Sequence, residues 1–341
     1  MYFKSLQILR AIAALSVIFY HIHIYSVLIG NNYENWFKIF KENFAYGALF
    51  FFVLSGFLMA YLIDIDYKDF LRLRILRIYP TYIIAVILVI FFKVMIFGSI
   101  ENEKLYLAIT LLPFGELQYP LGIEWTLIYE VFFYLICSLF TTRILKRLYL
   151  FFLITWFNII IVGDFIFHTQ TLFKPYISNI LFSSFNLLFI CGSIAYLIAK
   201  KIEKPNKSYD YLGIMIAFSL VFLSNISTAT LVKNLMLGTG FSMIIMIAYL
   251  RDKYPNKNKK ILFIETITSF AETFGDYSYG IYLVHVPIIT VIFSVSKNMF
   301  NFPINSEICL ISLVISLFVG WHYGRMELNI YKKLKMLVKY K

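Results

Sequence analysis

The sequence predicts an all-α fold, a polytopic bundle of about ten transmembrane helices with both termini in the cytoplasm. The first observation is composition: of 341 residues, 60% are hydrophobic and 15% are charged, whereas a soluble domain carries roughly 25% charged residues. The second is that apolar runs near the ~20 residues that cross a bilayer recur along the chain. The third is that Lys and Arg collect in alternate loops. We therefore expect one membrane-embedded domain over residues 1–341 and no soluble domain.

The apolar runs define the expected spans in chain order. They cover residues 6–29, 46–63, 78–97, 119–140, 148–167, 178–199, 211–225, 231–250, 276–296 and 306–324. The first run carries Arg10 and is followed by no small-residue cleavage site, so we expect a retained span rather than a removed signal peptide. The run from Lys104 to Phe114 is too short to cross, which fits an interfacial or re-entrant segment.

The basic residues set the expected orientation. Most of the 31 Lys and Arg residues lie before the first span, after every second span and in the tail, and basic loops remain cytoplasmic. Two amphipathic stretches beside these loops, Tyr67–Tyr79 and Ile261–Ala271, are expected in the lipid headgroup layer. Since the basic residues form no single stripe with interleaved aromatics, nucleic acid is not expected as a partner.

The first span carries one arginine and two histidines, Arg10, His21 and His23. Arg10 and His21 are eleven residues apart, which places them on one helix face, about 20° apart and about 16 Å apart along the axis. We expect both side chains to line one continuous path along this helix face, which we call a track. The plainer alternatives are that Arg10 extends to the headgroups and that His21 is a packing histidine. His23 points away from His21, and we expect no special role for it.

Other ionisable residues also lie at membrane depth, where each is a candidate functional residue because burial of a charge there is costly. Glu130 and His285 are deep in their spans, and the alternative for each is a tie between helices. Ser55 lacks the G-x-S-x-G spacing of a nucleophile elbow, so Ser55 and Gly56 are interpreted as small residues that allow close helix packing.

Arginines also gather after the second span. Arg72, Arg74 and Arg77 lie within one short segment and predict an anion site, the alternative being an anchor to anionic lipid. Glu327, at the end of the last span, is a candidate partner for one of these arginines. The three cysteines are far apart and have no His partners, so no metal site is expected.

Motifs in these segments together resemble the acyltransferase-3 family, membrane proteins that O-acylate bacterial surface polysaccharides among other acceptors. The motifs, in order, are Leu9-Arg-Ala-Ile-Ala-Ala-Leu15 running to His21, Phe51-Phe-Val-Leu-Ser-Gly-Phe57, the R-x-x-R of Arg74 and Arg77, Trp125-Thr-Leu with Glu130 and Tyr134, and Ser278-Tyr with Tyr282-Leu-Val-His285. The chain departs from the family pattern after Glu327, where Leu328 and Asn329 replace the usual x-Pro.

The resemblance implies an acetyltransferase of the cytoplasmic membrane that uses acetyl-CoA or another acyl-CoA. The implied acceptor is a hydroxyl of a surface glycan, such as O-antigen, capsule or exopolysaccharide, or of its lipid-linked precursor. Membrane lipid and the polysaccharide assembly machinery are the other expected partners.

On this interpretation His21 is the general base toward the acceptor hydroxyl, and Glu130 or His285 orients or charge-balances it. Arg10, Arg74 and Arg77, with Arg72, hold the CoA phosphates, and attack on the thioester is direct. The sequence leaves two alternatives: a carrier or flippase for lipid-linked glycan precursors, and a non-enzymatic anchor for a polysaccharide assembly complex.

Overall fold

The computed structural model describes residues 2–30, 35–98, 105–115, 119–167, 173–203, 207–255 and 262–339. Within these ranges the fold is all-α: they contain no β-strand, only one isolated bridge between Phe114 and Tyr176. The α-helices are α1 (Lys4–Gly30), α2 (Tyr46–Asp64), α3 (Phe70–Phe97), α4 (Leu105–Ala108), α5 (Glu124–Leu139), α6 (Arg143–Lys146), α7 (Tyr149–Phe167), α8 (Asn186–Ala199), α9 (Lys207–Ser224), α10 (Thr230–Lys253), α11 (Leu262–Asn298) and α12 (Ser306–Lys339). Short 3-10 turns occur at η1 (Trp36–Ile39), η2 (Glu42–Ala45) and η3 (Ile180–Phe182).

The helices long and apolar enough to cross a membrane number seven in the described part of the chain: α1, α2, α3, α7, α10, α11 and α12. The other expected spans coincide with α5, α8 and α9, which are shorter. α5 begins only after Pro120 and Gly122, whose positive φ of 76° interrupts the expected run. α8 likewise begins only at Asn186, after the η3 turn. The all-α membrane class is thus confirmed, while the count of about ten spans stays a prediction.

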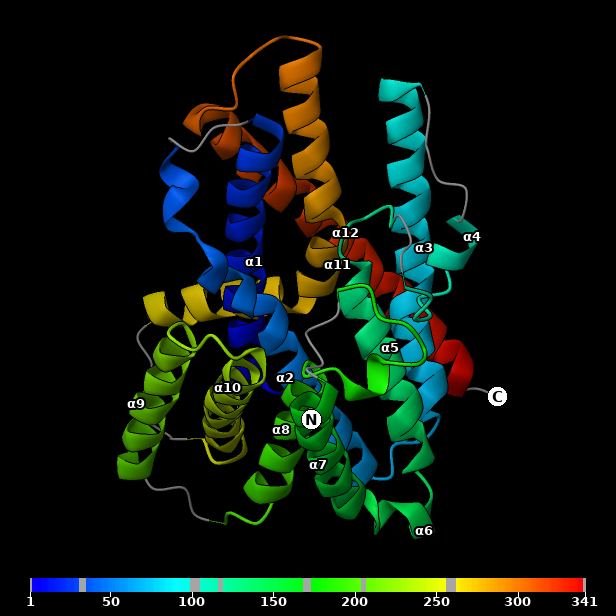
Figure 1. The fold of residues 1–341 in the computed structure, drawn as a ribbon, viewed down its shortest axis with the longest axis vertical. Helices are drawn as coiled ribbons and strands as arrows, with labels where there is room; N and C mark the ends of the chain where they lie inside the picture. The colour runs from blue at the N-terminus through cyan, green and yellow to red at the C-terminus, as the bar shows by residue number, and fades with distance from the viewer. Residues whose placement is uncertain are drawn as a thin grey trace.

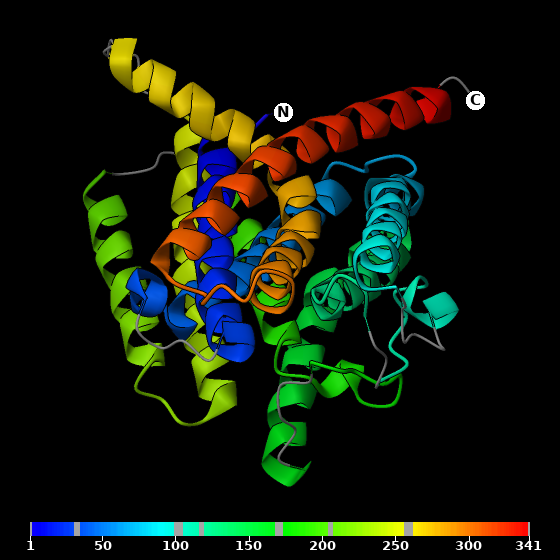
Figure 2. The same ribbon diagram turned by 90° about the horizontal axis from the view of Figure 1, so that it is seen from above.

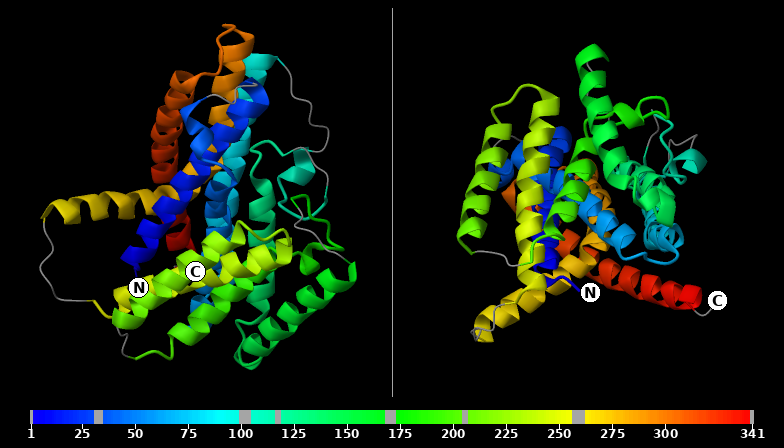
Figure 3. Two further views of the ribbon diagram at one scale, coloured as in Figure 1. Left: turned by 60° about the vertical axis from the view of Figure 1, so that its left-hand side comes forward. Right: turned by 90° about the horizontal axis from the view of Figure 1, so that it is seen from below.

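The two predicted amphipathic stretches are continuous with the spans that follow them. Tyr67–Tyr79 supplies the first turns of α3, which runs on through Pro80. Ile261 lies outside the described residues, and the rest of its stretch forms the beginning of α11. Figure 3 shows this first part of α11, in yellow, running across one end of the bundle before the orange part turns along it.

Two groups of helices meet along α1 and α2. In the first group, α1 packs along α11, and α11 packs along α12. In the second group, α2 packs along α8, α8 contacts α10, and α10 packs along α9. α3 and α5 close the remaining side, since α3 contacts α11 and α12 and α5 contacts α2 and α3. Figures 1 and 2 show α1, in dark blue, beside α2 and α11, and α1 also contacts α10 and α12. Polar side chains on its inward faces are therefore removed from lipid.

Glycines allow a close helix contact between α2 and α8. A Cβ added to Gly56 would lie 2.0 Å from the carbonyl oxygen of Phe189, and one added to Gly192 would lie 1.9 Å from that of Val53. Neither position can hold a larger residue without separating the helices. The predicted packing role of Gly56 is confirmed.

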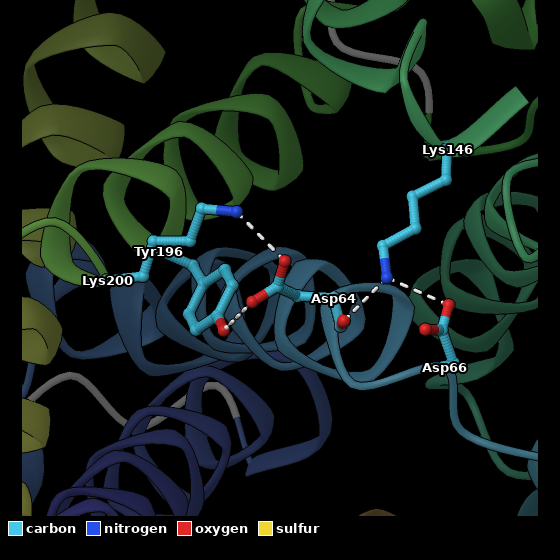
Figure 4. A network of polar contacts seen from close by, with 5 residues as sticks. All are labelled: Asp64, Asp66, Lys146, Tyr196 and Lys200. Atoms are coloured by element: carbon cyan, nitrogen blue, oxygen red, sulfur yellow. Dashed lines mark hydrogen bonds and ion pairs between the residues drawn. The ribbon is translucent and has the colours of Figure 1, made fainter. Parts of the chain in front are cut away.

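Polar contacts tie together the loops that the basic residues assign to the cytoplasm. Asp64 accepts hydrogen bonds from Tyr196 (2.8 Å) and Lys200 (2.9 Å), while Lys146 pairs with Asp66 (2.8 Å) and donates to the carbonyl oxygen of Asp64 (2.6 Å) (Figure 4). We call the end of the bundle that carries these residues the basic end. At the opposite end, which we call the outer end, Tyr46 donates to Asn225 (2.7 Å). The contacts thus follow the predicted grouping of loops, and which end faces the cytoplasm remains a prediction.

Candidate active site

A cavity of about 850 Å³, counted out to its mouth, opens among α1, α2, α3, α5 and α11. Its charged lining residues are Arg10, Arg74, Arg77 and Glu130. We call it the basic cavity. The structure therefore brings together three of the four arginines that were expected to bind the donor. Arg72 is exposed and is not among the lining residues, because it faces away from α3's neighbours.

Arg77 is neutralised by Glu327. Nη1 of Arg77 lies 2.6 Å from Oε1 of Glu327, whose side chain is fully buried. The contact is an ion pair without a well-aligned hydrogen bond from the described residues. The Arg77 guanidinium also lies over the rings of Tyr279 (5.7 Å) and Tyr331 (5.1 Å). Its first task is thus to compensate a buried carboxylate, which would otherwise be costly.

Arg10 and Arg74 carry the remaining positive charge of the basic cavity. Arg10 donates from Nη1 to Gln7 (3.1 Å), and the buried Nε of Arg74 has no hydrogen-bond partner among the described residues. Glu130 is the one further carboxylate of the lining, so the cavity keeps one formal positive charge in excess. An excess of positive charge from guanidinium groups favours the binding of an anion.

Glu130 belongs to this basic cavity rather than to the neighbourhood of His21. Its carboxylate accepts hydrogen bonds from Ser55 (3.0 Å) and from Tyr134. Ser55 therefore faces the cavity and donates to Glu130, beyond the packing role expected for it. The structure gives Glu130 a place beside the arginines, and it leaves His285 as the expected partner of His21.

His21 borders a second cavity toward the outer end, of about 1180 Å³ when the space open to solvent at its mouth is included. We call it the outer cavity. Its walls are largely aromatic and aliphatic, with a few polar side chains among them. The lining includes Tyr20, Tyr46, Trp125, Phe173, Phe185 and Tyr282 together with Glu42, Lys233 and Asn234. Apolar walls with a small number of placed polar groups are typical of sites that bind and orient an organic ligand.

The two histidines are in direct contact. Nδ1 of His21 lies 2.9 Å from Nε2 of His285, and Nδ1 of His285 lies 2.7 Å from the carbonyl oxygen of Tyr282. Because a carbonyl only accepts, His285 carries its proton on Nδ1, and the neutral ring presents Nε2 as an acceptor. His21 then donates from Nδ1, so its own Nε2 is unprotonated. That atom has the lone pair that a general base needs.

The two cavities adjoin instead of forming one track. Arg10 lines the basic cavity and His21 the outer cavity, so the expected single track along α1 is divided in two. Among the described residues, Ala48 of α2 and Tyr282 of α11 line both cavities. The division arises because side chains of α2 and α11 lie against α1 between Arg10 and His21, a contact between helices that the sequence of α1 alone does not reveal.

Two lining residues of α11 were not predicted individually. Ser278 and Tyr282 precede His285 by seven and three residues and share its face, as the i, i+4, i+7 spacing requires. The Ser278 hydroxyl is buried and has no partner among the described residues. Reading polar residues on the helix face of His285 would have found both.

These features define a polytopic membrane protein with a buried ionisable site between two adjoining cavities. The chain belongs to the acyltransferase-3 family, whose profile, described as an acyltransferase domain, matches residues 3–322. It is therefore a membrane acyltransferase, as the motif resemblance predicts. No curated protein and no solved structure gives a significant match. The family membership gives no support to the carrier alternative.

Proposed function

We propose that the protein is an O-acyltransferase of the cytoplasmic membrane. It transfers an acyl group, acetyl in the simplest case, from acyl-CoA to a hydroxyl of a cell-surface polysaccharide or of its lipid-linked precursor. The observation that carries the proposal is the pair of cavities, one basic and one lined by a histidine, which share the walls made by Ala48 and Tyr282.

The basic cavity suits the donor. Arg10 and Arg74 hold the phosphates of acyl-CoA, because guanidinium groups bind phosphate through paired, charge-assisted hydrogen bonds. Glu130 balances these charges when the cavity is empty. Arg77 stays paired with Glu327 and shapes the mouth of the cavity, and Arg72 has no place in this proposal. The positive-inside rule predicts that the segment that contains Arg72, Arg74 and Arg77 is cytoplasmic, and acyl-CoA is available on that side.

The outer cavity suits the acceptor. His21 Nε2 takes the proton of the acceptor hydroxyl while the oxygen of that hydroxyl attacks the thioester carbonyl carbon. The carbon–sulfur bond breaks, and the departing thiolate receives the proton from His21. His285 is a positioning residue, since it holds His21 in the tautomer that the step requires.

Direct attack is favoured over a covalent relay. The described cysteines are Cys137, Cys191 and Cys309, and none of them lines either cavity. Ser55 lines the basic cavity but donates its proton to Glu130 rather than to a histidine. The lining of the two cavities, as far as the structure describes it, thus offers no cysteine nucleophile and no serine paired with a histidine base.

Consumption of acyl-CoA tests the proposal. Purified protein in liposomes is supplied with acetyl-CoA and with glycan extracted from the host envelope, and free CoA is measured. Glycans from cells with and without the gene are then compared by mass spectrometry for an ester-sized difference. The proposal predicts glycan-dependent CoA release and the loss of an ester from the deletion strain. Absence of both would refute it.

A further inference from the structure

Tyr282 occupies the boundary between the two cavities. Of the two residues that line both, Ala48 has only a methyl group, whereas Tyr282 carries a hydroxyl. The Tyr282 side chain is nearly buried, and its ring lies near the rings of Phe51 (6.2 Å) and His285 (5.4 Å). Of the two residues shared by the cavities, Tyr282 is thus the one with a side-chain hydrogen-bonding group.

The hydroxyl of Tyr282 is the donor in its hydrogen bond with Thr126. Thr126 Oγ1 donates to the carbonyl oxygen of Ile123 (2.9 Å), and this uses its single proton. The 2.9 Å contact between Thr126 Oγ1 and the Tyr282 hydroxyl must then run from Tyr282 to Thr126. A neutral threonine oxygen is a modest acceptor, so a negatively charged oxygen would displace it.

The transfer reaction places such an oxygen at this boundary. The acceptor hydroxyl is activated by His21 in the outer cavity, and the donor's phosphates are held by arginines in the basic cavity. The thioester carbonyl carbon must then lie where the cavities adjoin. As the carbonyl is attacked, its oxygen gains negative charge, and a donor aimed at that oxygen lowers the barrier.

Ser278 supports the same path for the donor. It lies one helical turn before Tyr282 and lines the basic cavity, with a buried hydroxyl that lacks a partner among the described residues. A buried polar group without a partner costs free energy unless a ligand satisfies it. The arm of acyl-CoA that leads to the thioester carries amide groups, which can form a hydrogen bond with the Ser278 hydroxyl. α11 thus presents Ser278, Tyr282 and His285 in the order in which the donor arm, the carbonyl and the partner of the base His21 are required.

We propose, on the basis of the acyl transfer proposed above, that Tyr282 is a catalytic residue whose hydroxyl donates a hydrogen bond to the thioester carbonyl oxygen. It stabilises the oxyanion during attack and forms no covalent bond. Thr126 holds the hydroxyl in the resting state and releases it when the donor is bound.

The test compares Tyr282→Phe with Thr126→Val in the liposome assay, with acetyl-CoA as the varied substrate. Loss of one oxyanion donor lowers kcat on the order of 10²-fold to 10³-fold, so Tyr282→Phe is expected to lose kcat to that extent while KM for acetyl-CoA stays within about twofold. Thr126→Val removes only the resting partner, and its loss of kcat should be far smaller. Thermal unfolding in detergent is measured for both variants.

The alternative to this role is a structural tie between α11 and α5. A tie predicts that both variants break the same hydrogen bond and lose activity and thermal stability equally. That result, or full kcat in Tyr282→Phe, would overturn the catalytic role of Tyr282 while leaving the transferase intact. If the unaltered protein released no CoA, the proposed function itself would fail, so the two failures are distinct.

Discussion

His21 on α1 and His285 on α11 are joined by a contact of 2.9 Å between Nδ1 and Nε2. The two residues are 264 positions apart in the chain, and their contact lies where α1 packs along α11. His285 is itself fixed by the carbonyl oxygen of Tyr282 (2.7 Å). This chain of two hydrogen bonds fixes the tautomer of His21, with the proton on Nδ1, and leaves Nε2 free to accept a proton.

Removal of His285 should slow the reaction without weakening donor binding. His285→Ala is expected to lower kcat about 100-fold, the lower end of the effect of a positioned base, with KM for acyl-CoA unchanged. His285→Gln, whose amide oxygen accepts a hydrogen bond from His21 Nδ1, should recover part of the loss. Steady-state kinetics of CoA release decides this. Equal activity of His285→Ala and the unaltered protein would show that His21 needs no partner.

Arg74 should govern affinity for the donor. Loss of a charge-assisted hydrogen bond of about 1.5–3 kcal/mol predicts that Arg74→Gln raises KM for acyl-CoA about 10-fold to 100-fold, with little change in kcat. Arg72→Gln is the matched control, because Arg72 lies on the same helix but is exposed and outside the cavity. The rate of CoA release is measured against acyl-CoA concentration for both variants, and the KM values are compared. Equal effects of both substitutions would point to membrane-surface charge instead of a binding site.

The Arg77–Glu327 pair should contribute to stability. Removing one partner of a buried pair costs about 3–5 kcal/mol, so Arg77→Gln should lower the thermal unfolding midpoint in detergent markedly. The double variant Arg77→Gln with Glu327→Gln removes both charges of the pair, so it leaves no unpaired carboxylate at position 327 and should be more stable than Arg77→Gln alone. A double variant as unstable as the single one would mean that Arg77 acts through its contacts with Tyr279 and Tyr331.

The α2–α8 contact should not tolerate a single added methyl group. Gly56→Ala places Cβ against backbone atoms at 2.0 Å, which the helices relieve only by moving apart, and we expect loss of the folded protein from the membrane. Gly163→Ala is the control, since its Cβ would meet only the Phe182 ring at 3.5 Å. Size-exclusion profiles of detergent extracts compare them. A monodisperse Gly56→Ala protein at normal levels would contradict the packing described here.

Local sequence was enough to predict the helices and the polar residues at membrane depth. Composition and apolar period indicate helix segments, and the cost of burying a charge singles out Arg10, Glu130 and His285. Helix ends were less predictable, because turns before α5 and α8 shorten those helices. The contacts between these polar side chains were not predictable either. Which of Glu130 and His285 meets His21 depends on contacts between distant segments, and a single sequence leaves both open.

The division of the site into two cavities shows the same limit. The spacing of Arg10 and His21 along α1 predicts a shared face, but it carries no information on the side chains of α2 and α11 that lie between them. Arg72 and Arg74 show the same limit of prediction from a single sequence. Both belong to a basic segment, and only the packing of α3 decides which one reaches the cavity.

Replacement of His21 tests the central claim most directly. His21→Ala and His23→Ala are each expressed in cells that lack the chromosomal gene, and their levels in the membrane are compared. Surface glycans are then examined by mass spectrometry for the ester. Without its base the transfer should fall at least about 100-fold, so we expect the ester to vanish with His21→Ala and to persist with His23→Ala at equal protein levels. Glycans fully esterified by the His21→Ala protein would contradict the assignment of His21 as the general base.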